Sequence, residues 1–327
     1  MKSSKKVILA LAVVLLSTLL LGVGLAQEEK VNVWVVVHGG IADPFWKRVE
    51  KGVMDAAANH PADLEVTYTG PSEYNFTELM ADIEAAIASK PDVLVCTLTE
   101  PDAMDEVLRT AIADGLPVIA INAPDLREPP ENRIPVLTYV GEDSYHIGVV
   151  AAEETLKRFT PKRALFVNHH PGARNIEMRG RGFIDTLAKS DVPAEALDIT
   201  ADAVQGAEIT LAYLVSHPDT DVIFSTNTLR TETIITRLLD EGIDVGNEVK
   251  IASMDMSEKV LEYIQEGKIM FTLDQQQYLQ GYLGVEFAYL HAKYGFTPPP
   301  APVSTGPGVI TAENVPQLIE LSKQGYR

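Results

Sequence analysis

Residues 31–46 read V-N-V-W-V-V-V-H-G-G-I-A-D-P-F-W, and this stretch decides the expected fold. The valines form a nearly continuous apolar run, which is typical of a parallel strand buried on both faces. The glycines at the end of the run favour a turn, and residues 45–58 are predicted to form a helix. In open parallel sheets, ligands bind beyond the carboxyl ends of the strands. We therefore expect a ligand to meet His38, Asp43, Phe45 and Trp46. Simple packing is the alternative role for the two aromatic residues.

The composition indicates a globular protein and limits its partners. The chain has 327 residues, of which 46% are hydrophobic. This is enough for roughly two domains with a sizeable core. The formal net charge is -19, and because like charges repel, it argues against nucleic acid and anionic membrane surfaces as partners. A neutral or cationic small molecule is easier to accommodate.

Residues 1–26 differ from the rest and are expected to be a secretory signal peptide. Residues 1–6 are basic, residues 7–21 form an apolar run, and Gly24 and Ala26 are small residues before the expected cleavage point. An uncleaved membrane anchor is the alternative, but the apolar run is short for a spanning helix. No cysteine follows the run, so a lipoprotein anchor has no acceptor. We expect a periplasmic or secreted protein.

Strand and helix patterns alternate through the first half of the chain, as a doubly wound parallel sheet requires. Strands are expected at residues 64–68, 92–98, 117–121 and 136–140, and helices at 76–89, 103–114 and 145–159. Asp143 or Ser144 is the expected cap of the last helix. Cys96 is the only cysteine, so no intramolecular disulfide can form, and its place in a strand predicts an inert, buried thiol.

The pattern begins again after residue 161, which indicates two lobes of like topology. P-D-V-L-V-C-T-L in the first half matches T-D-V-I-F-S-T-N in the second, and I-A-D-G-L matches L-D-E-G-I. P-V-I-A-I-N and V-K-I-A-S-M-D end at Asn122 and Asp255, and two predicted helices carry Gly52 and Gly182 before an apolar residue. Any two βαβ units share periodicity, but four matches in one order favour a true repeat.

The last part of the chain does not fit the repeat. A helix at 260–266 and a strand at 269–273 precede D-Q-Q-Q and a long helix at 278–294. T-P-P-P-A-P is expected to be an extended connector, and a strand near Val309 and a helix at 311–322 close the chain. The polypeptide is therefore expected to recross between the lobes before it ends.

The strand ends of the second lobe supply further candidate ligand residues. They are polar side chains that follow strands or begin helices: His169, His170, Arg174, Asn175, Asn227 and Asp255. With the aromatic residues of the first lobe, this mixture suits a polyhydroxylated ligand. An aromatic face covers the C–H side of a sugar ring, while amides, carboxylates and a guanidinium hold its hydroxyls. Helix capping is the alternative role for Asn227 and Asp255.

Catalytic and metal-binding motifs are missing from the sequence. It has no G-x-S-x-G, no G-x-x-x-x-G-K-S/T, no H-E-x-x-H and no G-x-G-x-x-G after a strand. His169 and His170 are adjacent on an extended segment, so their side chains point in opposite directions, and no Cys or His lies at a supporting spacing. We therefore expect no metal, no cofactor and no enzymatic activity.

The signal peptide, the two lobes and D-P-F-W after the first strand resemble the type I periplasmic solute-binding proteins of ABC transporters, specifically the ribose-binding-protein-like sugar group. The likeness covers the mature chain and includes R-G-R-G-F, S-H-P-D-T-D-V-I-F-S-T-N, I-A-S-M-D and D-Q-Q-Q. It implies two similar doubly wound, Rossmann-like α/β lobes joined by a three-strand hinge, with crossings near residues 141–142, 275–276 and 306–308. The implied lobes are residues 31–141 plus 276–308 and residues 142–275 plus 309–327.

The resemblance also implies a function and a site. In that family, the residues that match Asp43, Phe45, Trp46, Asn227, Asp255 and Gln275 contact the sugar. The implied protein is a monomer that captures a monosaccharide-like ligand, a sugar or polyol, by hinge closure and presents it to the transmembrane subunits of an ABC permease. A ligand-sensing receptor of the autoinducer-2 or chemotaxis type and a secreted carbohydrate-active enzyme are the alternatives.

Three positions depart from the ribose-binding pattern and leave the ligand open. Asn122-Ala123 stands where those proteins have an Asp-Arg pair, Ala201 where they have a second stacking aromatic, and Glu177 near the position of a helix-opening arginine. Glu142, beside an expected crossing, is either a ligand group or a hinge residue. Another pentose, a hexose, a polyol and a furanone signal therefore remain open beside ribose.

Overall fold

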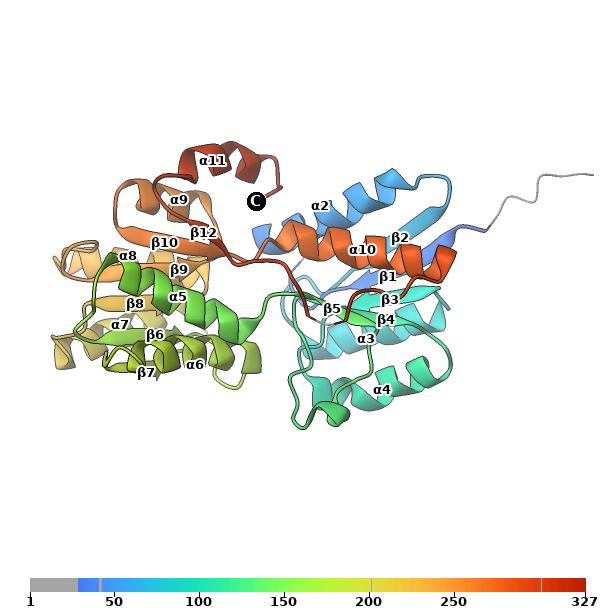
Figure 1. Ribbon diagram of the computed structural model, residues 1–327, viewed down its shortest axis with the longest axis horizontal. Helices are drawn as coiled ribbons and strands as arrows, with labels where there is room; N and C mark the ends of the chain where they lie inside the picture. The colour runs from blue at the N-terminus through green and yellow to red at the C-terminus, as the bar shows by residue number, and fades with distance from the viewer. Residues whose placement is uncertain (1–28, 41–42, 201, 301) are drawn as a thin grey trace, which may run out of the picture. The chain divides into compact units, whose positions relative to one another are not determined.

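The computed structural model describes residues 29–40, 43–200, 202–300 and 302–327 (Figure 1). The expected signal peptide, residues 1–26, and Ala201 lie outside the described residues. Among the described residues, no helix is both long enough and apolar enough to cross a membrane.

Residues 31–327 form two six-stranded sheets with the same strand order. The first sheet runs β11-β5-β4-β3-β1-β2 and the second runs β12-β10-β9-β8-β6-β7. Neighbouring strands are parallel, except that β12 is antiparallel to β10. The strands are β1 (Val31–Val36), β2 (Leu64–Thr69), β3 (Val93–Cys96), β4 (Val118–Ile121), β5 (Thr138–Gly141), β6 (Ala164–Asn168), β7 (Ala194–Asp198), β8 (Val222–Ser225), β9 (Lys250–Met254), β10 (Ile269–Asp274), β11 (Val303–Ser304) and β12 (Gly308–Ile310). The expected fold class, two similar doubly wound α/β lobes, is confirmed.

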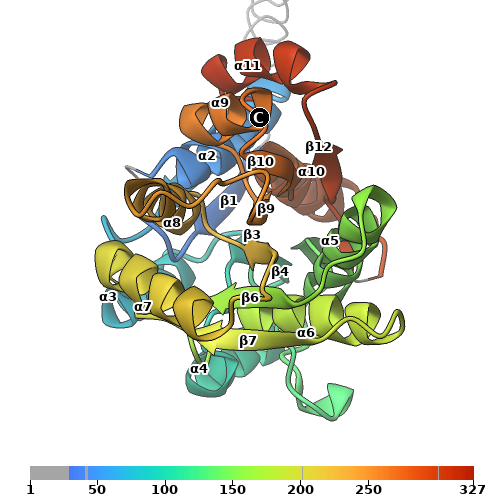
Figure 2. The same ribbon diagram turned by 90° about the vertical axis from the view of Figure 1, so that its left-hand side faces the viewer.

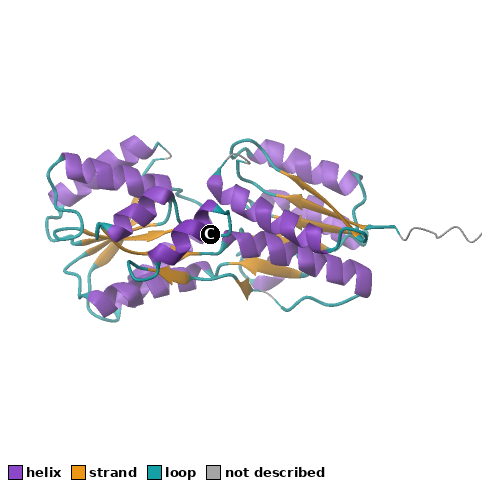
Figure 3. Cartoon of the chain, turned by 90° about the horizontal axis from the view of Figure 1, so that it is seen from above, coloured by secondary structure: helices purple, strands orange, loops and turns teal. Residues whose placement is uncertain are grey.

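Helices cover both faces of each sheet, as Figure 3 shows with helices in purple and strands in orange. In the first lobe α2 and α10 pack on one face and α3 and α4 on the other. In the second lobe α5 and α6 cover one face, and α7, α8, α9 and α11 the other (Figure 2). The helices are α2 (Pro44–Asn59), α3 (Phe76–Ala88), α4 (Pro101–Ala113), α5 (Ser144–Arg158), α6 (Arg174–Ala188), α7 (Ala203–Ser216), α8 (Thr228–Asp240), α9 (Glu258–Gln265), α10 (Gln277–Tyr294) and α11 (Val315–Lys323), with a short 3-10 helix η1 (Pro130–Asn132).

The chain passes between the two sheets three times, as the resemblance implied. The first crossing follows β5 of the first sheet and leads into α5, which packs in the second lobe. The second follows β10 of the second sheet and leads into α10, which packs against β1 and α2 of the first. The third joins β11 to β12. The two-residue strand β11 was not expected, because the proline-rich stretch before it carries no strand pattern.

The strands are built from apolar residues and form the core, as the valine run of the sequence predicts. Val33 and Val35 of β1 are fully buried between helices, as is Cys96 of β3. Burial raises the pKa of the Cys96 thiol to about 12, so the thiol stays protonated and unreactive, as expected. The helix expected at 311–322 begins only at Val315, because residues 311–314 form a turn in which the Thr311 N–H donates to the Asn314 side chain at 2.8 Å.

Two helix pairs repeat the same close contact, α10 with α2 and α5 with α6 (Figure 1). A Cβ atom at Gly52 would lie 2.1 Å from the carbonyl oxygen of Tyr278, and one at Gly182 would lie 2.1 Å from that of Tyr145. The reverse contacts match as well, since a Cβ at Gly281 would approach the carbonyl oxygen of Val49 and one at Gly148 that of Arg179. Glycine is required wherever helix backbones come this close.

The same two tyrosines make equivalent side-chain bonds. Tyr278 Oη donates to Asp55 at 3.0 Å, and Tyr145 Oη donates to Asp185 at 3.2 Å. Asp55 follows Gly52 by three residues, and Asp185 follows Gly182 by three. The helix pairs are therefore copies of one arrangement, and residues can be matched between the halves by counting from these glycines.

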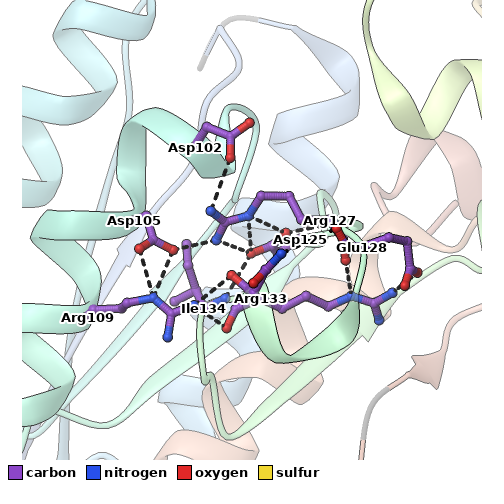
Figure 4. A network of polar contacts seen from close by, with 9 residues as sticks. Asp102, Asp105, Arg109, Asp125, Arg127, Glu128, Arg133 and Ile134 are labelled. Carbon is purple, nitrogen blue, oxygen red and sulfur yellow. Dashed lines mark hydrogen bonds and ion pairs between the residues drawn. The ribbon is translucent and has the colours of Figure 1, made fainter.

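A network of ionic side chains holds the long connection between β4 and β5 (Figure 4). Asp125 accepts from the backbone N–H of Ile134 at 2.8 Å and pairs with Arg127, which also binds Asp105 of α4. Burial opposes ionisation of Asp125, but Arg127 outweighs it and holds the pKa of that carboxyl below its usual value. The connection begins at Asn122, so this network fixes the loop that follows a candidate site residue.

Candidate functional site

Aromatic rings gather where β1 and β2 of the first sheet end. The imidazole of His38 lies edge-on to Trp46, with ring centroids 4.8 Å apart, and to Tyr74 at 5.9 Å. Phe45 lies against Trp46 at 4.9 Å. A Cβ at Gly39 would lie 1.4 Å from the indole nitrogen of Trp46, so only glycine leaves room for this ring. The structure thus brings together His38, Phe45 and Trp46 and adds Tyr74.

Tyr74 also links the two lobes. Its ring lies 6.2 Å from that of His170, which follows β6 of the second sheet. The carboxyl ends of β2 and β6 therefore face one another at this point. The sequence analysis missed Tyr74, although an aromatic residue in a strand-to-helix connection was a usable signal.

Asp43 lies at the beginning of α2 with its side chain exposed. Its carboxylate accepts from the backbone N–H of Phe45 at 2.8 Å and caps the helix. The cap fixes the start of the helix that carries the aromatic residues. One carboxylate oxygen is engaged in this way.

Asn122 and Asp255 occupy matching strand ends in a left-handed backbone conformation, with φ of 62° and 67°. The Asn122 N–H donates to the carbonyl of Val140 at 3.1 Å, and the Asp255 N–H donates to that of Leu273 at 2.8 Å. Short polar side chains tolerate this conformation better than others. The equivalence that the repeat indicated between these two residues is therefore present in the backbone.

Gln275 connects the two strand ends through its side-chain amide. Its Nε2 donates to both carboxylate oxygens of Asp255 at 3.0 and 3.1 Å, and its Oε1 accepts from Asn122 Nδ2 at 3.3 Å. Gln277 Nε2 donates to Asp255 as well, at 2.7 Å. Gln275 is buried and lies on the second crossing, so it ties a residue of each sheet to the hinge.

Asp255 is the most perturbed carboxyl group of this region. Burial raises its pKa from 3.8 to about 7, with Asp274 and Glu142 adding to the rise, while Arg179 and the Gln275 amide oppose it. A carboxylate held in this way gains from each further hydrogen bond that it accepts. Ligand hydroxyl groups would supply such bonds.

Glu142 and Arg179 form a buried ion pair at the first crossing. Arg179 Nε donates to Glu142 Oε1 at 2.8 Å, and Ser144 Oγ donates to the same oxygen at 2.9 Å. The Arg179 side chain is only 5% exposed and that of Glu142 is fully buried. Arg181 forms a second ion pair on the exposed side of α6, where its Nε lies 3.5 Å from Asp185.

The strand ends of the second sheet supply His169 and Asn227. His169 Nδ1 lies 3.5 Å from Thr226 Oγ1, and burial, together with Arg179 and Arg230, lowers the pKa of His169 to about 3. Asn227 caps α8 by accepting from the Arg230 N–H at 3.1 Å. The capping alternative for Asn227 is thus observed.

Arg174 and Asn175 lie at the beginning of α6. Arg174 is exposed, and Asn175 is partly buried. Among the described residues, neither side chain is hydrogen-bonded to the other candidate residues. The sequence predicts both near the site because of their position after β6, and the structure places them in the first turn of α6.

Several buried polar atoms at the strand ends have no hydrogen-bond partner among the described residues. They include atoms that follow strands of the first sheet, one on a strand of the second sheet, and one each at the first and second crossings: His38 Nδ1, Thr97 Oγ1, Ser253 Oγ, Glu142 Oε2 and Gln277 Oε1. Buried polar groups in proteins are normally paired, so these unpaired atoms are candidates for contact with a polar ligand. Burial also lowers the pKa of His38 to about 3, with His170 contributing, so this ring is neutral at pH 7.

Two further observations concern metal binding and a pocket away from the facing strand ends. Within the described ranges, no group of three or more His, Cys, Asp or Glu residues could hold a metal ion. A pocket of about 630 Å³ lies at the opposite, amino end of the second sheet. Asp221 accepts from the Lys162 N–H at 3.0 Å, and Lys250 lies over the ring of Phe159 at 4.8 Å.

Comparison with protein families gives a match over most of the chain. The family model described as "Periplasmic binding protein domain" matches residues 34–295. The xylose/arabinose-binding protein XylF of Sulfolobus acidocaldarius is 26% identical over 301 residues, which cover 89% of this chain and 74% of that protein. The ribose import binding protein RbsB of Bacillus subtilis is 23% identical over 254 residues, 77% of this chain and 79% of that protein.

Solved structures are similar as well. A carbohydrate transporter from Acidothermus cellulolyticus 11B in complex with myo-inositol has a TM-score of 0.78 and 26% identity, and the match covers 91% of this chain and all of that chain. A periplasmic sugar binding protein from Legionella pneumophila has a TM-score of 0.74 and 25% identity over 82% of this chain and 97% of that chain.

Proposed function

Since the chain belongs to the periplasmic binding protein family, we propose that it captures a monosaccharide or polyol at the facing strand ends and presents it to an ABC permease. The unpaired buried polar atoms beside the aromatic cluster carry this proposal. Sugars and polyols combine an apolar C–H face with directional hydroxyl groups, and both kinds of surface are met here.

The ligand contacts that we propose follow the two kinds of surface. Trp46 and Phe45 cover the apolar face, while Asp255, Gln275 and Glu142 receive hydroxyl groups. Two neutral imidazoles and five further polar side chains complete the proposed set: His38, His169, Asp43, Asn122, Arg174, Asn175 and Asn227. Closure of the two lobes over the ligand would follow, because Tyr74 and His170 meet from opposite sheets.

The polar network argues for a neutral ligand other than plain ribose. The Asn122 amide, which replaces an aspartate of the ribose pattern, already donates to Gln275 and Gln280. Its donor group is therefore occupied, and its neutral amide oxygen is a weaker acceptor for a ligand hydroxyl than a carboxylate is. XylF is named for xylose and arabinose, RbsB for ribose, and the Acidothermus transporter was solved with myo-inositol, so these ligands form the first test set.

The protein would act outside the cytoplasm as a binding protein that releases its ligand unchanged. Arg179 is committed to Glu142, so it does not serve as a free cation for a reaction. N-terminal sequencing of the exported protein tests the location, and we expect the mature chain to begin near residue 27.

Native mass spectrometry of the exported protein, followed by release and identification of any bound small molecule, tests the function first. We expect an intact sugar or polyol. A thermal-shift and calorimetry panel of D-xylose, L-arabinose, D-ribose and myo-inositol then ranks ligands, since a ligand that binds only the folded state raises the melting temperature.

Two variants sharpen the assay. Trp46→Ala should lose the ligand-induced shift, whereas Arg181→Ala, on the exposed side of α6, should keep it. No bound molecule together with no response to the whole panel would contradict the proposal. A ligand recovered as a reaction product would contradict the binding role.

A further inference from the structure

Gln280 is a fully buried polar residue in α10, and its position in the repeat calls for an apolar one. It immediately precedes Gly281, and the matching residue before Gly148 in α5 is Ile147, which is also fully buried. An amide in such a place costs free energy unless all its bonds are made. The exchange of isoleucine for glutamine at an equivalent core position therefore indicates a specific task.

The side-chain amide of Gln280 donates hydrogen bonds toward Gln275 and accepts one from Asn122. Its Nε2 donates to the backbone carbonyl of Gln275 at 3.2 Å and to Gln275 Oε1 at 3.2 Å, and its Oε1 accepts from Asn122 Nδ2 at 3.0 Å. Thr305, on the third crossing, donates to the same backbone carbonyl at 2.8 Å. Gln280 thus touches two crossings and a strand end at once.

A backbone carbonyl can only accept, and this fixes the polarity of the whole chain of amides. Gln280 Nε2 must face the carbonyl, so Gln280 Oε1 must face Asn122. The Gln275 Oε1 atom then receives two donors, from Asn122 and Gln280. The amide of Gln275 is left with its Nε2 pointing at Asp255.

We propose that Gln280 is a positioning residue that locks the Gln275 amide with its donor toward Asp255, and so keeps Asp255 as a carboxylate acceptor for the ligand. Without the lock, Gln275 could turn over and accept a hydrogen bond from a protonated Asp255. The lock opposes this exchange because the Nε2 donor of the turned Gln275 amide would face two other donors, Asn122 Nδ2 and Gln280 Nε2. The part of the inference that concerns ligand affinity rests on the proposed function.

The groups that surround Asp255 come from several elements. Arg48 of α2 and Arg179 of α6 are the cations that interact with it, and Glu142 and Asp274 are the anions. None of them contacts Gln280 directly. Replacing Gln280 therefore leaves the charges near Asp255 unchanged, and any shift in its titration reports on the amide chain.

The test replaces Gln280 with the residue of the other half, as Gln280→Ile, and with the isosteric Gln280→Met. Tyr278→Phe in the same helix is the matched control, because its hydroxyl donates to Asp55 of α2, away from the amide chain. The Asp255 carboxyl is titrated in the ligand-free protein by carbon NMR of aspartate-labelled samples, with Asp255→Asn to assign the signal. We expect the pKa of Asp255 to rise in both Gln280 variants and to stay unchanged in the control.

The affinity for the ligand provides a second test of the role of Gln280. The affinity of each of the four probes, D-xylose, L-arabinose, D-ribose and myo-inositol, is measured at about pH 8 and about pH 6. In the Gln280 variants we expect a loss of about tenfold at the lower pH and a smaller loss at the higher, since protonation removes the acceptor. A residue that merely fills the core would change both values equally.

The outcomes separate the two proposals. An unchanged pKa of Asp255 in a folded Gln280→Ile protein overturns the inference, whatever the ligand. Binding of none of the four probes by the wild-type protein counts against the proposed function, while the titration still decides the role of Gln280. A raised pKa with an equal affinity loss at both pH values would overturn the claim that the lock serves the ligand.

Discussion

The two lobes share one backbone plan and differ in the chemistry that they bring to their strand ends. Counting from the matched glycines, Val49 of α2 corresponds to Arg179 of α6, and both are buried. The first lobe supplies an apolar contact at this position, whereas the second supplies one member of an ion pair. The comparison separates what the fold requires, a close helix contact, from what the site requires, a charge.

The crossings show the same division. Val140 and Leu273 accept from the matching strand ends, so Glu142 corresponds to Gln275, two residues further on in each case. A carboxylate at one crossing is bound by Arg179, and an amide at the other is bound to Asp255. The first and second crossings thus each carry a buried polar group that is held by a residue of the second lobe.

The largest loss of stability is expected when Arg179 of the second lobe is replaced by valine, the residue at the equivalent position of the first lobe. Arg179→Val leaves the buried carboxylate of Glu142 without its cation, which should lower the free energy of unfolding by about 3–5 kcal/mol. Urea unfolding monitored by circular dichroism measures the change. Arg181→Val, on the exposed side of the same helix, should change stability by less than about 0.5 kcal/mol.

A double variant keeps this prediction open to refutation. Arg179→Val combined with Glu142→Leu removes both charges, and it should recover most of the lost stability because apolar pairs replace buried ion pairs well. A single variant as stable as the wild type, or a double variant no better than the single, would show that the pair does not distinguish the lobes.

The second prediction concerns the matched strand ends. Asp255→Asn removes the negative charge that strengthens hydrogen bonds from ligand hydroxyls, and the affinity for the ligand should fall about 100-fold, or about 2.7 kcal/mol. Asn122→Ala should cost less than about tenfold, because the Asn122 amide is already bound to Gln275 and Gln280. Calorimetry with the best ligand of the panel measures both. Equal losses at the two positions would contradict the division of roles.

The sequence was informative wherever the signal is local. The valine run predicts β1, and the residues after the glycine turn predict α2. Asp143 or Ser144 is the predicted cap of α5, and Asp143 fills this role, since its side chain accepts from the His146 N–H at 3.0 Å. The repeat went further, because it paired Asn122 with Asp255, and both adopt the same backbone conformation.

Long-range pairing was beyond the sequence. The Glu142–Arg179 pair joins residues that are 37 positions apart, so no local pattern links them. Gln280 lies in a long helix, and its hydrogen-bond partners are on a strand end and on two crossings. No pattern within the helix predicts these bonds. Side chains of this kind are recognised only after the fold has placed them together.

The third prediction tests the shared part of the plan. Gly52→Ala and Gly182→Ala each place a Cβ 2.1 Å from a carbonyl oxygen of the facing helix. Separation of the helices should lower the free energy of unfolding by about 1–3 kcal/mol, and by a similar amount in the two lobes. Thermal and urea unfolding measure it, with Lys47→Ala on the exposed side of α2 as the control. Destabilisation confined to one lobe would show that the helix pairs are not equivalent.

The smallest effect is expected from the two matching histidines, His38 after β1 and His169 after β6. Burial lowers the pKa of each to about 3, so the unfolded chain, in which imidazole titrates near 6.5, binds more protons between these values. Their contribution to stability is present above pH 6.5 and is lost as the pH falls toward 3. At about pH 5.5, each histidine should cost about 1 kcal/mol relative to neutral pH.

Replacing either residue by glutamine, a neutral side chain that does not titrate, should remove its share of this loss. The melting temperature of each variant is followed from about pH 8 to about pH 5 and compared with that of His291→Gln, at an exposed hydrogen bond near the end of α10. The His38 and His169 variants should show flatter profiles than the wild type, and the control should not. If only the His169 variant flattened the profile, the nearby guanidinium groups of Arg179 and Arg230 would be the cause, and burial at the two strand ends would not be equivalent.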